Sequence, residues 1–343
     1  MTHINKSFAE LGVRDEICEA LRERGIEHPF AIQELTLPMA LAGDDLIGQA
    51  RTGMGKTFAF GVPALHKITT DTERPLTGAP RVLIVVPTRE LCIQVFDDLT
   101  GAAKNLTAPA EGGGTRPLSV VAIYGGRPYE PQIEALQAGA DVVVGTPGRL
   151  LDLAQQGHLQ LGGLSVLVLD EADEMLDLGF REDIEELLEK TPATRRTLLF
   201  SATLPREIQA LAKRFQKDAH RIATVGEREP HVDIDYQAML ISPRERELAV
   251  VNVLRFVDAG GALVFCATRD GVTHLAANLN ERGFAVVALS GELSQAERTR
   301  ALQSLRDGRA RVCIATDVAA RGIDGLVKSL TDKNKSFDPA RKP

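Results

Sequence analysis

Residues 46–57 have the sequence LIGQARTGMGKT, which is a short apolar strand, a glycine-rich turn and the start of a helix-like segment. Gly53 and Gly55 allow a tight turn whose backbone N–H groups converge on phosphate oxygens, helped by the positive end of the following helix. Lys56 would reach the β- and γ-phosphates of a nucleotide, and the Thr57 hydroxyl would ligate Mg²⁺. The residues expected to contact the nucleotide are Ala50, Arg51, Thr52, Gly53, Met54, Gly55, Lys56 and Thr57.

This loop departs from the usual phosphate-binding pattern in one place, because Ala50 stands where such loops carry their first glycine. The alternative interpretation is a glycine-rich turn between strand and helix that binds nothing. The strand before the turn, the Gly-Lys-Thr ending and the helix after it together favour the phosphate site. A nucleotide with Mg²⁺ is therefore the expected ligand.

A second group of polar residues, Asp170-Glu171-Ala172-Asp173, follows the apolar run of residues 164–169. Phosphoryl transfer to water needs a carboxylate that holds Mg²⁺ and a group that orients the attacking water. Asp170 suits the first task and Glu171 the second. An isolated acidic tetrapeptide is usually a solvated turn, but this one stands at the end of a strand in a chain with a phosphate-binding loop. The pattern therefore favours a catalytic role.

Around these motifs, short β-branched runs alternate with helix-length segments, which is typical of a parallel α/β sheet. In the first part of the chain, the expected strands are residues 44–49, 81–87, 118–125, 141–147, 165–173, 197–203 and 220–225. Helices are expected over residues 90–106 and 181–190, among others. Residues 107–117 are rich in Gly and Pro and are expected to form a surface loop.

A second α/β unit follows a polar stretch that begins at residue 226 and has the composition of a linker. Its expected strands are residues 237–242, 262–268, 285–291 and 311–317, and its expected helices are residues 245–257, 270–283 and 294–307. Two α/β units in series favour a site in a cleft between them.

The composition limits the class of protein. The chain has 343 residues, of which 44% are hydrophobic and 25% charged, as in soluble globular proteins of about two domains. Its apolar runs are strand-sized and its N-terminus is unlike a signal peptide, so membrane and secreted classes are excluded and a cytoplasmic location is expected. The four cysteines lie far apart, which indicates neither zinc nor disulfides. A formal net charge of −7 does not decide whether nucleic acid binds, because a local basic groove can exist on an acidic protein.

Together the two motifs resemble those of the DEAD-box ATP-dependent RNA helicases, and the resemblance extends over about residues 8–324. It implies two RecA-like parallel-sheet domains in tandem, with ATP and Mg²⁺ as ligands and RNA bound mainly through its backbone. Residues 25–33, GIEHPFAIQ, are similar to the family's adenine-sensing segment, so Gln33 is expected to hydrogen-bond the adenine edge. Phe8 stands at the position of the family's isolated aromatic; it either packs on the adenine ring or is a core residue at a helix start.

Three further segments of the first domain resemble the family's RNA-binding elements: residues 87–91, Gly125-Gly126 and residues 146–149. Each places small residues, hydroxyls or a helix N-terminus where a backbone phosphate can approach. The expected RNA contacts here are Thr88, Arg89, Gly126, Thr146, Pro147, Gly148 and Arg149. Such contacts do not depend on base identity, so little sequence preference is expected.

The resemblance also assigns residues that link the two domains and residues of the second. Ser201-Ala202-Thr203 is similar to the element that couples nucleotide state to domain closure, so Ser201 and Thr203 join Lys56, Asp170 and Glu171 as expected catalytic residues. In the second domain the expected RNA contacts are Thr268, Arg298 and Thr316, and Asp324 is expected at the ATP ribose.

Beyond Asp324 the resemblance ends. A family member would continue with further strands and a His-Arg-x-Gly-Arg-x-x-Arg element whose arginines meet the γ-phosphate, whereas this sequence continues as GLVKSLTDKNKSFDPARKP. Residues 325–343 carry five basic and two acidic side chains, a net charge of +3, and the residues before them carry −10. The sequence therefore favours an incomplete second domain with an atypical basic tail, and a natural lineage that lost the element is the alternative.

The expected organisation has five parts, which are an adenine-sensing segment (1–36), an ATP-binding domain (37–225), a linker (226–234), a partial C-terminal domain (235–324) and a basic tail (325–343). The expected function is an ATP-dependent RNA helicase that opens short duplexes locally. Loss of the arginine element is expected to cripple turnover. A non-hydrolysing, ATP-regulated RNA-binding clamp is the alternative. The sequence gives no indication of protein partners.

Overall fold

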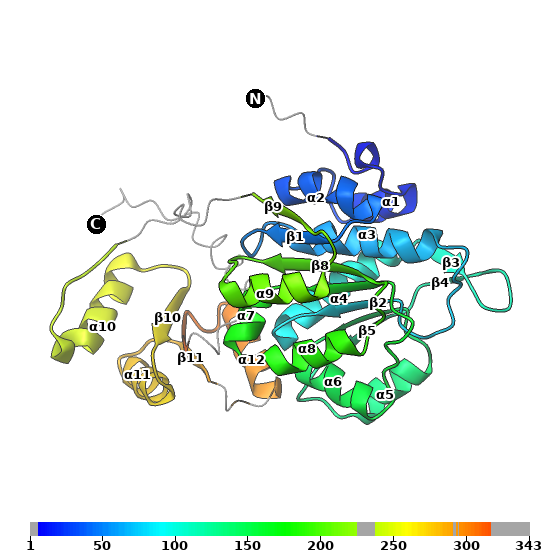
Figure 1. Ribbon diagram of the computed structural model, residues 1–343. Coiled ribbons are helices and arrows are strands. Elements are labelled where there is room, and N and C mark those ends of the chain that lie inside the picture. The colour runs from blue at the N-terminus through cyan, green and yellow to red at the C-terminus, as the bar shows by residue number, and fades with distance from the viewer. Residues whose placement is uncertain (1–5, 225–236, 291–292, 294, 317–343) are drawn as a thin grey trace. The chain divides into compact units, whose positions relative to one another are not determined.

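The computed structural model describes residues 6–224, 237–290, 293 and 295–316. The chain divides into two compact units, residues 1–229 and 230–343. Each unit is an α/β structure with its own parallel sheet, as the sequence predicts (Figure 1). The expected linker, residues 226–234, lies outside the described residues.

The first unit is built on a seven-stranded sheet in which all neighbouring strands are parallel, in the order β5-β6-β2-β7-β8-β1-β9. The strands are β1 (Leu46–Gln49), β2 (Val82–Val85), β5 (Val120–Ile123), β6 (Val142–Gly145), β7 (Val166–Leu169), β8 (Arg196–Ser201) and β9 (His220–Ala223). Each overlaps a run that the sequence predicts to be a strand. Their carboxyl ends lie along one edge of the sheet, because all of them run in the same direction.

Helices cover both faces of this sheet, α1 to α4 on one and α5 to α9 on the other (Figure 1). They are α1 (Asp15–Glu23), α2 (Ala31–Ala42), α3 (Lys56–Thr70), α4 (Arg89–Ala103), α5 (Glu130–Gln137), α6 (Pro147–Gln155), α7 (Ala172–Asp177), α8 (Arg181–Glu189) and α9 (Arg206–Phe215), with a 3₁₀ helix η1 (Ala9–Leu11) before them. In β7, Val166 and Val168 belong to one core and Leu167 and Leu169 to the other. Burial on both faces explains why the strands are continuous apolar runs.

Residues 107–117 differ from the surface loop that the sequence predicts. They form an antiparallel hairpin of β3 (Thr107–Pro109) and β4 (Thr115–Pro117). Gly112, Gly113 and Gly114 have φ of +89°, +97° and +77°, so they turn the chain without the steric cost that a side chain would bring. The Gly and Pro content that predicts a loop instead supplies the turn and the strand ends.

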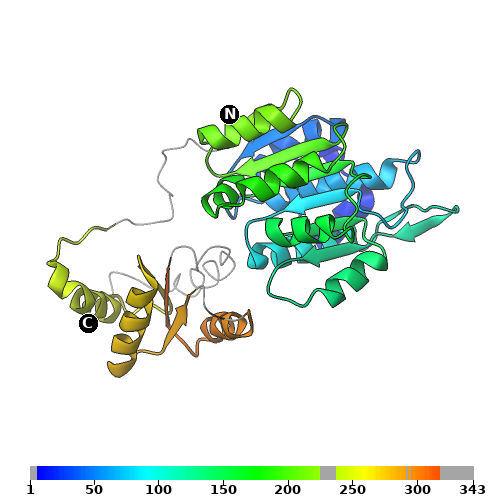
Figure 2. The ribbon, with the colours of Figure 1, turned by 60° about the horizontal axis from the view of Figure 1, so that its bottom comes forward.

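The second unit has a three-stranded parallel sheet in the order β10-β12-β11. Its elements are η2 (Pro243–Glu245), α10 (Arg246–Val257), β10 (Ala262–Cys266), α11 (Arg269–Glu281), β11 (Val286–Leu289), α12 (Gln295–Arg306) and β12 (Val312–Thr316). Figure 2 shows α11 and α12 on opposite faces of these strands. In β12, Val312 and Ile314 pack with the helices of one face, and Cys313 and Ala315 pack with α12 on the other.

Residues 237–242 are not the strand that the sequence predicts. They form no regular element, Met239 is 62% exposed and Leu240 is fully exposed. An apolar run becomes a strand only where a neighbouring strand supplies hydrogen bonds and burial, and within the described part of the chain none pairs with this one. Among the same residues, no helix is both long and apolar enough to cross a bilayer.

Candidate functional site

Apart from Phe8 and Gln33, the predicted site residues of the first unit lie at or just after the carboxyl ends of its strands. The phosphate-binding loop follows β1, the acidic tetrapeptide follows β7 and Ser201 ends β8, and these strands are neighbours in the sheet. The segments with Thr88, Gly126 and Thr146 follow β2, β5 and β6, which are also neighbours. The edge therefore has two adjoining halves that meet between β2 and β7, and this edge is where open parallel sheets bind ligands.

The loop after β1 has the geometry of a phosphate cradle. Gly53 and Gly55 have φ of +82° and +81°, which side chains rarely adopt. At Gly55 space is also lacking, since a Cβ would lie 2.5 Å from the Phe30 ring and 2.6 Å from Gln33 Nε2. Gln33 is fully buried; its Nε2 donates to Gly55 O at 2.7 Å and its Oε1 accepts from Phe30 N at 2.9 Å. Residues 25–33 are therefore anchored to the loop through Gln33.

Lys56 begins α3 and contacts both carboxylates of the turn after β7. Its Nζ lies 3.6 Å from Asp170 Oδ1 and 3.5 Å from Glu171 Oε1, and all three residues are at most 5% exposed. Thr52 Oγ1 in the loop also donates to Glu171 Oε1 at 2.9 Å. The phosphate-binding loop and the acidic tetrapeptide therefore form one cluster.

This cluster leaves one negative charge uncompensated, because it buries two carboxylates with one ammonium group. Burial raises the pKa of Asp170 to about 6, against the opposing attraction of Lys56. Burial alone would lower the pKa of Lys56, but the negative charges of Asp170, Glu171 and Asp173 together raise it. A divalent cation would neutralise this excess negative charge.

The residues present fit Mg²⁺ that arrives with a nucleotide. Within the described ranges, no group of three or more His, Cys, Asp or Glu side chains could hold a metal ion. Nucleotide sites hold Mg²⁺ with one or two carboxylates and the substrate phosphates, so a full protein cage is not required. Asp170, in the buried cluster, and Thr57, in the first turn of α3, are the side chains that would hold it.

The backbone turns sharply at Glu171, between β7 and α7. Its φ of 52° and ψ of 50° are left-handed, a conformation that costs about 1–2 kcal/mol for a residue with a side chain. Glu171 N donates to Asp170 Oδ1 at 3.0 Å, which fixes the two acids relative to each other. Strain of this size is held where the surrounding structure over-determines it, as at functional sites.

The structure also shows a contact that the sequence did not predict, between the turns after β7 and β8. Asp173 Oδ2 accepts from both N and Oγ1 of Thr203 at 2.8 Å, and Asp173 N donates to Ser201 Oγ at 3.2 Å. Although burial acts to raise it, hydrogen bonds from Thr203 and Ser201 keep the pKa of Asp173 below its usual value. The sequence assigns no role to Asp173 of the acidic tetrapeptide, because its partners Ser201 and Thr203 lie about thirty residues further along the chain.

Phe8 is a buried core residue at a helix start, which is one of the two interpretations that the sequence allows. It is 3% exposed and belongs to the same buried cluster as Leu11 and Val13. Its carbonyl oxygen accepts from Leu11 N at 3.2 Å and Val13 N at 3.1 Å, so its backbone organises the start of η1. Contact between Phe8 and an adenine ring stays a prediction.

In the other half of the edge, the turns after β2 and β5 lie against each other. Thr88 caps α4, its Oγ1 accepting from Leu91 N at 3.3 Å. Gly126 has φ of +77°, and a Cβ there would lie 2.3 Å from Arg89 Nη1. The glycine therefore makes room for the Arg89 guanidinium, and the two predicted RNA contacts are brought together.

Arg149 projects from the first turn of α6, after Thr146, Pro147 and Gly148. Its guanidinium carbon lies 3.8 Å from the centroid of the Tyr129 ring, and its Nη1 donates to Arg127 O at 3.0 Å. A helix N-terminus with an arginine beside it is a favourable place for a phosphate. The sequence predicts Arg149 but not its aromatic support.

In the second unit, two predicted residues lie at the carboxyl ends of neighbouring strands. Thr268 follows β10 and caps α11, its Oγ1 accepting from Gly271 N at 3.1 Å, while Thr316 ends β12 opposite Cys266. Arg298 lies in α12. The predicted ribose contact Asp324 lies outside the described residues.

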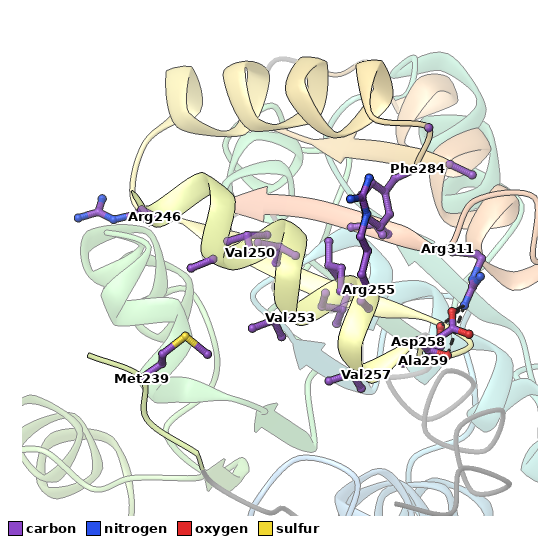
Figure 3. Close-up of a pocket in the computed structure, with 18 of the residues that line it drawn as sticks. Met239, Arg246, Val250, Val253, Arg255, Val257, Asp258, Ala259, Phe284 and Arg311 are labelled. Carbon is purple, nitrogen blue, oxygen red and sulfur yellow. Dashed lines mark hydrogen bonds and ion pairs between the residues drawn. The ribbon is translucent and has the colours of Figure 1, made fainter. Parts of the chain in front are cut away.

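A cavity of about 670 Å³ in the second unit contains none of these residues (Figure 3). Its lining is mostly apolar, with Val250 and Val253 of α10 and Phe284 among it. Arg311 borders it, donating to Asp258 Oδ1 at 2.9 Å and Ala259 O at 2.7 Å. The cavity lies toward the amino ends of β10 and β12, so the candidate site is assigned from side-chain chemistry and not from cavity size.

Comparison with known families gives the class of protein. The pattern of the DEAD/DEAH box helicases matches residues 30–211, and that of the helicase conserved C-terminal domain matches residues 246–325. The first match alone covers more than half of the chain. The chain belongs to the DEAD/DEAH box helicase family.

Curated relatives are similar over nearly the whole chain. The ATP-dependent RNA helicase DeaD of Klebsiella pneumoniae and that of Escherichia coli strain K12 are each 40% identical to it over 324 residues. The alignments cover 94% of this chain but 48% and 49% of those proteins. The chain thus spans about half the length of these curated relatives.

Solved structures agree with the fold. A DEAD box protein from Methanococcus jannaschii is 36% identical with a TM-score of 0.56, the match covering 93% of this chain and 82% of that one. Dbp5 from S. cerevisiae, bound to RNA and ADP BeF3, is 28% identical with a TM-score of 0.75, covering 93% and 78%. These similarities confirm the tandem RecA-like domains expected from the sequence.

Proposed function

We propose that this chain is an ATP-dependent RNA helicase that couples ATP hydrolysis to the local opening of short RNA duplexes. The observation that carries the proposal is the divided carboxyl edge of the first sheet. One half holds the phosphate cradle with Lys56, Asp170 and Glu171, and the other holds helix N-termini with Arg89 and Arg149. The relatives named as ATP-dependent RNA helicases support the same activity.

In this proposal each buried side chain of the cluster has one task. Lys56 holds the β- and γ-phosphates, and Asp170 with Thr57 holds Mg²⁺, which when bound neutralises charge on the transferring phosphoryl group. Glu171, held by the Thr52 hydroxyl, orients the attacking water and accepts its proton. Asp173, bonded to Ser201 and Thr203, connects this chemistry to the closure of the two units on ATP and RNA.

Specificity follows from the same contacts. Gln33, already anchored to Gly55 and Phe30, is proposed to hydrogen-bond the adenine edge, so ATP is favoured over GTP. RNA is held through its backbone by both units, which makes binding dependent on salt and nearly independent of sequence. A cytoplasmic location remains part of this proposal, and fractionation of cells expressing a tagged chain would check it.

The deciding experiment measures phosphate release from ATP with and without single-stranded RNA, together with the opening of a short RNA duplex. A helicase shows RNA-stimulated release, and Glu171→Gln abolishes the release while keeping nucleotide binding. ATP-dependent RNA binding without release would instead support the non-hydrolysing clamp, the alternative that the sequence left open, or the crippled turnover expected from the sequence. Release that RNA does not stimulate would contradict both.

A further inference from the structure

Arg149 is held on two sides by neighbouring groups. The Tyr129 ring lies under its guanidinium at 3.8 Å, and the Arg127 carbonyl accepts from Nη1 at 3.0 Å. A guanidinium has five N–H donors, so stacking on a ring face and a hydrogen bond through Nη1 leave other N–H donors for a ligand. The held geometry therefore reduces the conformational entropy lost when Arg149 binds a phosphate.

The same tyrosine also binds the nearest acid. Its hydroxyl donates to Asp152 Oδ2, and Asp152 Oδ1 accepts from Gln156 Nε2 at 2.7 Å. Asp152 lies three residues after Arg149 on α6, a spacing at which opposite charges on a helix pair readily. Hydrogen bonds from Tyr129 and Gln156, with a smaller effect of the Arg149 charge, hold the pKa of Asp152 below its usual value, yet among the ion pairs of the described residues none joins Arg149 to Asp152.

The loop that carries Tyr129 is itself fixed. Gln132 is 6% exposed; its Oε1 accepts from Tyr124 N at 3.0 Å and its Nε2 donates to Pro128 O at 2.9 Å. Tyr129 O accepts from Ile133 N at 2.9 Å in the first turn of α5, and its ring packs partly against the core. The ring and hydroxyl are therefore set by the fold and do not depend on RNA.

We propose that Tyr129 is a positioning residue for RNA binding, which supports the Arg149 guanidinium and holds Asp152 away from a direct ion pair with it. This inference rests on the proposed RNA contact of Arg149. It adds two groups, Tyr129 and Asp152, whose coupling decides how much of the arginine's charge is available to a backbone phosphate.

The test measures the affinity of the full chain for a fluorescent single-stranded RNA at several salt concentrations. Tyr129→Phe keeps the ring but frees Asp152, so RNA affinity should fall by about two- to fivefold. Adding Asp152→Asn to Tyr129→Phe should restore the affinity to within about twofold, because the freed acid is gone. Tyr129→Leu removes ring and hydroxyl together and should weaken binding by about tenfold. Affinity for a fluorescent nucleotide should stay unchanged in all these variants.

Two results would overturn the inference while leaving the RNA contact intact: unchanged affinity in Tyr129→Phe, or a loss that Asp152→Asn does not reverse. Arg149→Ala separates this from failure of the proposed function. This variant should bind RNA more weakly, and the slope of log affinity against log salt concentration should become shallower by about one, the contribution of one phosphate contact. An Arg149→Ala chain that binds RNA as the unchanged chain does would remove the contact on which the inference rests.

Discussion

Among single residues, Lys56 is the buried cation that lies beside the two carboxylates of the candidate site. It is 5% exposed and lies within 3.6 Å of both Asp170 and Glu171, which raise its pKa above the usual value against burial. A buried ammonium group of this kind stays protonated at neutral pH. It is therefore available to phosphate oxygens without a change of charge.

Lys56→Ala should weaken ATP binding by more than tenfold, over about 1.4 kcal/mol, because a charge-assisted contact to the phosphates is lost in a buried site. The matched control is Lys67→Ala, on the same helix, whose side chain is 37% exposed and pairs with Asp71. Titration with a fluorescent ATP analogue measures both. Equal losses in the two variants would show that the effect comes from α3 and not from the site.

Asp170→Asn should stabilise the nucleotide-free protein at alkaline pH. Folding raises the pKa of Asp170 from 3.8 to about 6, so the folded state disfavours the ionised form. That penalty is fully present above about pH 6 and disappears as the pH falls below 3.8, where the carboxyl is mostly protonated in both states. Calorimetry should show a gain of about 1–3 kcal/mol for Asp170→Asn at pH 8 and almost none at pH 3.

The exposed Asp97→Asn is the control for this experiment. A gain of equal size in Asp97→Asn, or a full gain in Asp170→Asn that persists at pH 3, would argue against burial of the Asp170 charge as the cause. Since Mg²⁺ needs the ionised form, binding of nucleotide with Mg²⁺ should also weaken below pH 6 in the unchanged chain.

The sequence could single out Lys56, Asp170 and Glu171 as candidate site residues because the motifs that contain them have fixed local spacing. It could not predict that Asp173 bonds Thr203, or that Tyr129 supports Arg149. These contacts join turns that follow different strands, and only the order of strands in the sheet brings them together. Pairwise geometry of that kind has no signature in one sequence.

Among the elements, α4 and α11 begin in the same way, although they belong to different units. Thr88 and Thr268 each accept a backbone N–H from three residues on, at 3.3 and 3.1 Å. Both threonines are also predicted RNA contacts. A capping role and an RNA role therefore compete as explanations of the same hydroxyl.

Thr88→Asp separates the two roles. Aspartate caps a helix as well as threonine does, so stability should hold, but its charge should repel phosphate and weaken RNA binding by about tenfold. Thr88→Ala should instead cost about 1 kcal/mol of stability through the lost cap. The melting temperature and the RNA affinity of both variants together separate the capping role from the RNA role. Strong RNA binding by Thr88→Asp would remove Thr88 from the RNA-binding surface.

Most strands could be predicted because a strand buried on both faces is a continuous apolar run, as in β2, β6 and β7. The two errors have a common cause. Residues 107–117 pair through their own backbone despite a loop-like composition, and residues 237–242 lack a partner despite a strand-like one. Pairing is a tertiary property, and composition reports it only indirectly.

At the scale of the whole molecule, two units with separate sheets and cores should unfold separately. Calorimetry should show two transitions, and ADP with Mg²⁺ should raise only that of the first unit, which holds the cradle. At a ligand concentration of 100 times Kd the stabilisation should be about 2.7 kcal/mol. Hydrogen exchange assigns each transition to its unit.

Lys56→Ala should reduce that shift to about half or less, while Arg298→Ala, on α12 of the second unit, should leave it in place without RNA. If ADP raised both transitions, or the second alone, the cradle of the first unit would not be the main nucleotide site in the absence of RNA.

The carboxyl edge of the first sheet also has a consequence for how the sequences of such proteins can change during evolution. Each contact turn is a short insertion between a buried strand and a surface helix, so its length and side chains can change while the strands keep their register. Under the proposed function, mutations in one half of the edge can change nucleotide binding while mutations in the other half change RNA binding. The exception is the junction of β2 and β7, where a change in the spacing of the two strands would affect both halves at once.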